Sequence, residues 1–208
     1  MIKRTLLLSL LLASGSLQAQ DQAADNNVAR PIIDTVCLAC HMGDGNSLVS
    51  EQPKLAGQNA EYLYKQMRDF ASATRVNPIM NGMIAMLPDD ESLKAAAEFY
   101  AAQKLDPAAS RNEDKNSDAF KMGEKLWRAG VASKGLPACA SCHGAAGKGM
   151  PAQYPALAGQ FPEYIELQLK TFRDETRTND PSKMMRDIAL KMTDKEIQAV
   201  SDYAAGLR

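Results

Sequence analysis

Apolar side chains recur every three or four residues in several parts of the chain, which places them on one face of a helix. Between residues 59 and 72, for example, Leu63, Met67 and Phe70 follow this spacing. The alternation of apolar and polar residues that is typical of a half-buried strand does not appear. The pattern therefore predicts an all-α fold. The segments predicted to be amphipathic helices are residues 59–72, 89–103, 161–174 and 194–206.

A further helix is predicted over residues 117–130, SDAFKMGEKLWRAG. Ser117 belongs to the residue types that cap helix N-termini, and Gly130 to the type that commonly follows the last turn. The preceding residues, 105–116, are polar, contain Pro107 and have no apolar period, so they predict a linker. Nearer the N-terminus, Pro31 is expected to limit the first helix, which is therefore predicted to be short.

The two halves of the chain are related by an internal repeat. A shift of 102 residues places PKLAGQ (53–58) on PALAGQ (155–160). The repeat predicts the duplication of one domain, with the first copy in residues 20–104 and the second in residues 117–208. The same shift also pairs Tyr62 with Tyr164, Gln66 with Gln168, Phe70 with Phe172, and Arg75 with Arg177.

The N-terminus has the features of a secretory signal. Lys3 and Arg4 form a basic segment, a leucine-rich run follows, and LQA provides a cleavage site after Ala19. The apolar run is shorter than the roughly 20 residues that span a membrane, and an uncleaved anchor is the alternative. Residues 1–19 are thus predicted to be a signal peptide, and the mature protein is expected to be exported without a transmembrane segment.

Charge excludes one class of partner. The chain has 24 basic and 25 acidic residues, and loss of Lys3 and Arg4 would leave 22 basic residues and a net charge of −3. Nucleic-acid binding needs a basic surface and is therefore not expected. The charge is uneven: residues 20–104 carry −4, residues 105–116 carry −1 and residues 117–208 carry +2. This polarity either orients docking to charged partners or is without consequence.

Every cysteine and histidine lies in one of two pentapeptides, CLACH (37–41) and CASCH (139–143). Exported proteins often contain disulfides, but the His that follows each Cys pair points elsewhere. A thioredoxin-type pair needs a thiolate of low pKa in a βαβ setting, which the sequence does not predict. A structural zinc needs four ligands, whereas the two motifs are about a hundred residues apart.

The spacing favours covalent attachment of c-type haem. Two thiols separated by two residues reach one porphyrin edge from a single helical turn and form thioethers, and the adjacent His then ligates the iron. This chemistry uses all three residues and leaves no free thiol. The residues assigned to one haem are Cys37, Cys40 and His41, and those assigned to the second are Cys139, Cys142 and His143.

Each iron then needs a ligand on its opposite face. No third His exists, so Met is the candidate, although most of the 11 Met residues are expected to be core filler. With a three-residue insertion near residues 179–182, the repeat pairs Met80 with Met185, and these are the predicted axial ligands. The alternatives are Met83 or Met184 as ligand, or five-coordinate irons with Met80 and Met185 in the core.

These features resemble the cytochrome c4 family, the dihaem class I cytochromes c of bacterial periplasms. The resemblance implies two tandem class I cytochrome c domains, each with one haem c ligated by His and Met. It also implies periplasmic transfer of electrons from respiratory donors to a terminal oxidase or another reductase, and such partners would account for any association with the membrane surface. The segments that carry the resemblance are the two pentapeptides, PKLAGQ and PALAGQ, FRDETRTND (172–180), NPIMNGM (77–83) and MMRDIALKMTDKEI (184–197).

The predicted function is that of an electron carrier without catalytic activity. An iron with both axial positions filled offers substrate no coordination site, and a thioether ligand raises the reduction potential. The alternative is a dihaem peroxidase or a cytochrome subunit of an oxidoreductase. A peroxidase needs an open haem face and distal acid–base groups, and the chain has no spare His for that role, which leaves Glu or Gln.

The resemblance also suggests residues around each haem. A carbonyl at Pro53 or Pro155 would accept a hydrogen bond from the axial His, and an ordinary turn proline is the alternative. Apart from the resemblance, four further side chains would either contact the haem propionates or be solvated or packed elsewhere, namely Arg75, Arg177, Tyr62 and Tyr164.

Overall fold

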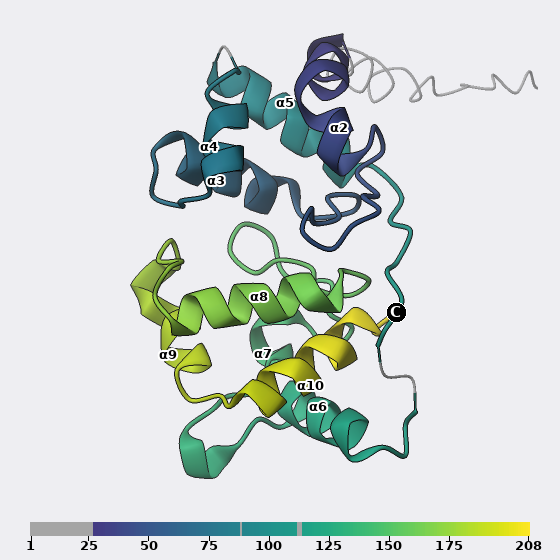
Figure 1. Cartoon of the computed structure of the whole chain (residues 1–208), viewed down its shortest axis with the longest axis vertical. Coiled ribbons are helices and arrows are strands. Elements are labelled where there is room, and N and C mark those ends of the chain that lie inside the picture. Colours follow the sequence, from purple (N-terminus) through teal and green to yellow (C-terminus); the bar gives the residue numbers. More distant parts are fainter. Residues whose placement is uncertain (1–26, 88, 112–113) are drawn as a thin grey trace, which may run out of the picture.

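The computed structural model of the chain describes residues 27–87, 89–111 and 114–208 (Figure 1). The predicted signal peptide and its cleavage site lie outside these residues. The described chain is helical, and the β contacts found in it are two isolated bridges, Val131 with Leu136 and Met150 with Tyr154. The all-α prediction is confirmed. The helices form two groups, with the N-terminal domain above the C-terminal domain in Figure 1.

The elements of the two domains follow the predicted repeat. The N-terminal domain has a helical turn at residues 27–32, the π-helix η1 (Ile33–Cys37), α2 (Leu38–His41), α3 (Ala60–Ala71), α4 (Pro78–Ile84) and α5 (Asp90–Ala101). The C-terminal domain has α6 (Asp118–Arg128), the 3₁₀ turn η2 (Ala132–Lys134), α7 (Ala140–His143), α8 (Pro162–Arg173), the 3₁₀ turn η3 (Pro181–Lys183), α9 (Met184–Ala189) and α10 (Asp194–Ala205).

Local sequence signals explain the ends of several helices. The Ser117 hydroxyl accepts a hydrogen bond from the backbone N–H of Phe120 and caps α6, and Gly130 follows the last turn with a φ of 66°. Thr193 and Glu196 form a reciprocal capping box at the start of α10. Asn77 caps α4 by accepting from the N–H groups of Ile79 and Met80.

The first helix extends further upstream than expected. Residues 27–32 are helical with Pro31 inside the segment, so Pro31 does not mark the beginning of the helix. Pro31 is the fifth described helical residue and lies beyond the first turn, so this position lacks the N–H that would donate an intrahelical hydrogen bond. The backbone then continues through the π-helix η1 into α2 without a break.

Each domain packs its last helix against an earlier one. In the N-terminal domain α5 lies against α3, and in the C-terminal domain α10 contacts both α6 and α8. The crossing of α6 and α10 is close, since a Cβ added at Gly123 would come within 2.3 Å of the Ala199 carbonyl oxygen. Trp127, on α6, is 1% exposed and donates its indole N–H to the Ala145 carbonyl at 3.1 Å.

The linker lies against both domains. Its Asp106 N–H donates to the Asn46 side chain in the N-terminal domain, and its Ala108 N–H donates to the Gly159 carbonyl in the C-terminal domain. Arg111 forms ion pairs with Glu166 and Asp202. These contacts hold the connection between the domains against their surfaces.

Candidate haem-binding sites

Both pentapeptides form a single helical turn. Cys37 ends η1 and Cys40 lies in α2, while Cys139 is the N-cap of α7 and Cys142 lies within it. Residues three apart on a helix are neighbours on its surface, so one turn presents both sulfurs of a pair to the same side. All four cysteines are partly exposed and none is in a disulfide. The two thiols of each cysteine pair are therefore positioned to attach to the same prosthetic group.

His41 and His143 are buried and oriented in the same way. Each is 7% exposed, and its Nδ1 lies 2.9 Å from the Pro53 carbonyl oxygen or 3.0 Å from that of Pro155. A carbonyl only accepts, so Nδ1 carries the proton and Nε2 keeps its lone pair. Burial lowers the pKa of both His residues and keeps the imidazoles neutral. A neutral His held by a carbonyl is the usual form of an axial ligand.

The cysteines do not have the chemistry of a redox pair. Burial raises the pKa of Cys37 and of Cys139 to about 11, although the Tyr100 hydroxyl partly opposes the shift at Cys37. Thioredoxin-like pairs need the opposite shift, toward a reactive thiolate. Zinc is not supported either, because no three His, Cys, Asp or Glu side chains within the described ranges are grouped as metal ligands.

One continuous cavity of about 440 Å³ extends from one pentapeptide, across the boundary between the domains, to the other. Its lining is mostly apolar, which suits a porphyrin, and the thiols and imidazoles are the groups that haem c needs. The predicted ligands Met80 and Met185 line this cavity, but so do Met83 and Met184. The structure therefore does not distinguish between the candidate Met ligands, and their assignment stays a prediction.

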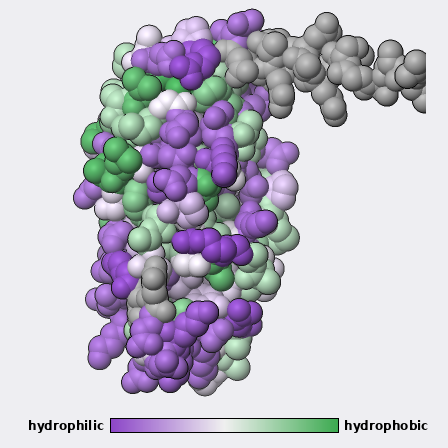
Figure 2. Space-filling view, turned by 90° about the vertical axis from the view of Figure 1, so that its right-hand side faces the viewer, coloured by the Kyte–Doolittle hydropathy of each residue, from purple (hydrophilic) through white to green (hydrophobic). Residues whose placement is uncertain are grey.

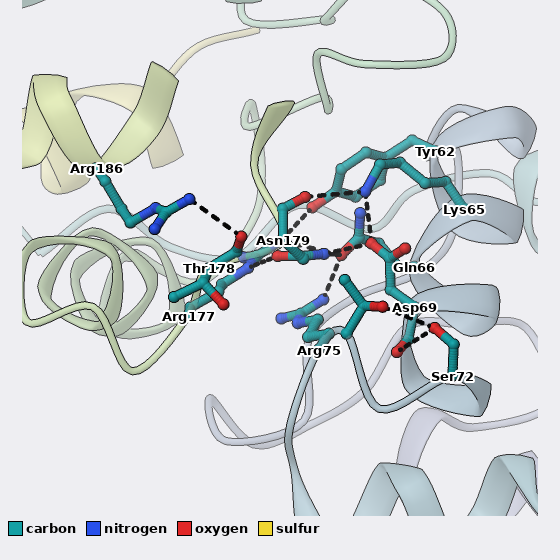
Figure 3. A network of polar contacts seen from close by, with 11 residues as sticks. Tyr62, Lys65, Gln66, Asp69, Ser72, Arg75, Arg177, Thr178, Asn179 and Arg186 are labelled. Atoms are coloured by element: carbon teal, nitrogen blue, oxygen red, sulfur yellow. Dashed lines mark hydrogen bonds and ion pairs between the residues drawn. The ribbon is translucent and has the colours of Figure 1, made fainter. Parts of the chain in front are cut away.

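A polar network joins the domains beside the cavity, and Figure 3 shows part of it. The Arg75 guanidinium, in the N-terminal domain, donates to Gln66 at 2.9 Å and to Gln168 of the other domain at 2.9 Å. The Arg177 guanidinium makes the mirrored pair, to Gln168 at 2.7 Å and to Gln66 at 3.0 Å. The two Arg residues thus occupy equivalent places in the repeat and bind the same two glutamines.

Two tyrosines also take part in this network between the domains. Arg177 donates to the Tyr62 hydroxyl at 3.3 Å, and Arg75 donates to the Tyr164 hydroxyl at 3.2 Å. Burial would raise the pKa of Tyr62, but the two guanidiniums outweigh it and hold that pKa below its usual value. Within the described ranges neither Arg75 nor Arg177 has a carboxylate within salt-bridge distance.

The repeat diverges where the second copy is longer. Asn77 caps α4, whereas its counterpart Asn179 instead donates to Gln66 across the domain boundary at 2.9 Å. The three additional residues lie in the turn that leads to α9, where Ser182 and Lys183 have positive φ. The Asp180 carboxylate accepts from the backbone N–H and the guanidinium of Arg186, which holds this turn against α9.

Sequence reasoning missed one pair of residues at these sites, Gln58 and Gln160. Each forms hydrogen bonds with the backbone of the other domain, next to the proline whose carbonyl accepts from the histidine of that other domain. The signal that would have indicated them was their identical position at the end of PKLAGQ and PALAGQ.

Comparison with known proteins places the chain in a family. The cytochrome c family model matches residues 120–207. The chain is 42% identical to cytochrome c4 of Thiocapsa roseopersicina over 195 residues, which cover 93% of this chain and 98% of that one. It belongs to the cytochrome c4 family. The crystal structure of reduced cytochrome c4 from Pseudomonas stutzeri aligns with a TM-score of 0.79 at 36% identity, covering 90% of this chain and 98% of that one.

A further relative of this chain has a name that states a function. It is the thiosulfate dehydrogenase electron acceptor of Stutzerimonas stutzeri, 38% identical over 92% of this chain and 90% of the relative. As a member of the cytochrome c4 family, the chain is an electron carrier and not an enzyme, and it carries two haem c groups, one on each CxxCH motif. No helix in the described part of the chain is long and apolar enough to cross a membrane.

Proposed function

We propose that this chain is exported to the periplasm after cleavage at Ala19 and carries electrons from a respiratory donor to a terminal oxidase or another periplasmic reductase. The domain of residues 20–104 would bind one haem and the domain of residues 117–208 the other. The linker, residues 105–116, would join the two domains. The observation that carries the proposal is the pair of buried, neutral histidines, each held by a proline carbonyl in one shared apolar cavity.

We assign Met80 and Met185 as the sixth ligands of the two irons. Met80 packs against the cluster of Phe70, Ile84 and Leu93, and Met185 packs against the C-terminal core, so both are held in fixed surroundings. A His/Met-ligated haem c stores and releases one electron at a raised potential. What the chain contributes is orientation of both ligands and an apolar surrounding that excludes water and substrate.

We expect Arg75 and Arg177 to hold haem propionates. Both line the cavity, and the hydrogen-bond acceptors found for their guanidiniums are neutral amides and hydroxyls. Buried cations without a carboxylate partner are costly, and an anionic group would offset that cost. The same two side chains therefore join the domains and favour the propionate edge of each haem at the domain boundary.

The surface suits transient partners of opposite charge. The predicted domain charges of −4 and +2 would let a basic partner approach the N-terminal domain and an acidic one the C-terminal domain. Figure 2 shows a mostly hydrophilic face with hydrophobic residues gathered in its upper half. Ile79, which lines the cavity and is 68% exposed, provides an apolar contact near the N-terminal site. The name of the S. stutzeri relative makes thiosulfate dehydrogenase a candidate donor.

Proton NMR of the reduced holoprotein tests the axial assignment. A Met methyl bound to low-spin ferrous haem lies over the ring, and its signal is shifted far upfield. We expect two such signals, which disappear one at a time in Met80→Leu and Met185→Leu. Persistence of both signals in these variants, or their loss in Met83→Leu or Met184→Leu, would overturn the assignment.

A further inference from the structure

Each domain inserts one glutamine against the histidine-supporting backbone of the other. The Lys54 N–H donates to the Gln160 carboxamide oxygen at 3.0 Å, and the Gln160 amide nitrogen donates back to the Lys54 carbonyl at 2.9 Å. Gln160 comes from the C-terminal domain and Lys54 from the N-terminal domain. Both side chains are buried, at 7% exposure each.

The mirrored contact is made by the other glutamine. The Ala156 N–H donates to the Gln58 carboxamide oxygen at 2.8 Å, and the Gln58 amide nitrogen donates to the Ala156 carbonyl at 2.9 Å. Each glutamine oxygen also accepts the N–H of the residue that follows it, Asn59 at 2.9 Å or Phe161 at 3.0 Å. Both carboxamides are therefore fixed in orientation, with the oxygen toward the opposite backbone.

These contacts lead directly to the histidines through one peptide group. The Pro53 carbonyl and the Lys54 N–H belong to the same peptide, whose oxygen accepts from His41 and whose N–H donates to Gln160. Likewise, the peptide between Pro155 and Ala156 accepts from His143 and donates to Gln58. Each His is thus one peptide away from a side chain of the other domain.

We propose that Gln160 sets the reduction potential of the N-terminal haem and Gln58 that of the C-terminal haem, each acting as a positioning residue across the domain boundary. Donation of a peptide N–H polarises the peptide and makes its carbonyl a stronger acceptor. A stronger acceptor draws the Nδ1 proton and makes the His a more basic ligand, which stabilises ferric iron and lowers the potential. One electron reaches the iron on reduction, and the Nδ1 proton stays on the His throughout.

This inference rests on the proposed ligation of iron by His41 and His143, and it makes a crossed prediction. Loss of Gln160 should raise the potential of the haem in the N-terminal domain, although Gln160 belongs to the C-terminal domain. Loss of Gln58 should raise that of the C-terminal haem. A purely structural role for the glutamines would move both potentials together or neither.

The test uses the holoprotein with Gln160→Leu and Gln58→Leu, and Gln198→Leu as an exposed control on α10. Redox titration followed by NMR resolves the two haems through their separate methyl signals. We expect the reduction potential of the haem in the opposite domain to rise, and to rise by more than any change for the haem in the same domain. The control should leave both reduction potentials unchanged. Equal shifts of both haems, a larger shift of the own-domain haem, or no shift would overturn the proposal.

If a variant fails to fold, a measurement on the unmodified protein still tests the proposal. Scalar coupling through the hydrogen bonds should connect the Lys54 amide with the Gln160 carboxamide, and the Ala156 amide with that of Gln58. Absence of both couplings would overturn the inference. Carbon monoxide binding to the unmodified protein would instead contradict the proposed function, so the two failures are distinguishable.

Discussion

At the scale of single residues, the choice of the sixth ligand depends on how the two copies of the repeat are aligned. Met184 and Met185 are adjacent, and both line the cavity, as do Met80 and Met83. Only the repeat separates them, because it pairs Met80 with Met185 once the turn before α9 is treated as an insertion.

Met185→Ala should therefore open the C-terminal iron. Without its thioether the reduced haem has a free axial position and should bind carbon monoxide, which the optical spectrum detects. Met184→Ala is the matched control and should leave the spectrum unchanged. If Met184→Ala opens the iron and Met185→Ala does not, the register is wrong by one residue.

The thiol and imidazole positions were predictable because CxxCH combines three reactive groups in a fixed local spacing. The hydrogen bonds of His41 and His143 to proline carbonyls agree with the sequence expectation. The contacts of Gln58 and Gln160 were not predictable, because they depend on how two domains pack, and no local pattern contains that arrangement.

At the scale of elements, the close crossing of α6 and α10 depends on a glycine, which has no side chain to separate the two helices. Gly123→Ala should lower the free energy of unfolding by about 1–3 kcal/mol, since the new methyl would overlap the backbone at Ala199. Chemical denaturation measures this loss.

Gly82→Ala is the matched control, in α4, where an added Cβ meets nothing within 4 Å. It should stabilise the protein by up to about 1 kcal/mol, because alanine favours helix over glycine. Comparable destabilisation by both substitutions would contradict the close crossing as the cause.

The capping box of α10 gives a pH dependence. Burial would raise the pKa of Glu196, but hydrogen bonds from Lys134 and Thr193 outweigh it and hold that pKa below its ordinary value of 4.5. A carboxyl whose pKa is lowered by folding stabilises the protein above its ordinary pKa, and this contribution disappears as the pH falls through the folded pKa.

Glu196→Gln should therefore be less stable than the parent at pH 7, and the difference should vanish in acid below the lowered pKa. Thermal unfolding of the two proteins across this pH range measures it. A difference that persists unchanged in acid would show that the charge of Glu196 does not stabilise α10.

The long helices were predictable to within one or two residues because 11 or 12 residues contain several apolar periods. The shorter α4 and α9, of 7 and 6 residues, contain too few periods to be recognised. The helix around Pro31 was underestimated because proline was expected to bound the helix, whereas the helical backbone continues on both sides of it.

At the scale of the whole molecule, the domain boundary is held by a crossed arrangement. Gln66 and Gln168 each accept from both Arg75 and Arg177, so the network is symmetric under exchange of the domains. The duplication that the sequence predicts thus reappears as a pseudo-twofold contact, which the sequence did not predict.

Arg177→Met should loosen this contact. The guanidinium of Arg177, 8% exposed, binds Gln66 and Tyr62 across the boundary, and loss of bonds to a charged group should cost about 3 kcal/mol. Denaturation followed at the haem bands should show lower stability and less coincident unfolding of the domains. Arg68→Met, at a solvent-exposed Arg, should change little. Equal effects of both substitutions would argue against a special role for the boundary.

The most direct test of the whole account is the optical spectrum of the dithionite-reduced holoprotein before and after addition of carbon monoxide at neutral pH. Both irons are proposed to be closed by His and Met, so the account predicts no change in the spectrum. A carbon monoxide shift at either haem would reveal an open coordination site, and it would contradict both the assignment of Met80 and Met185 and the role of a simple electron carrier.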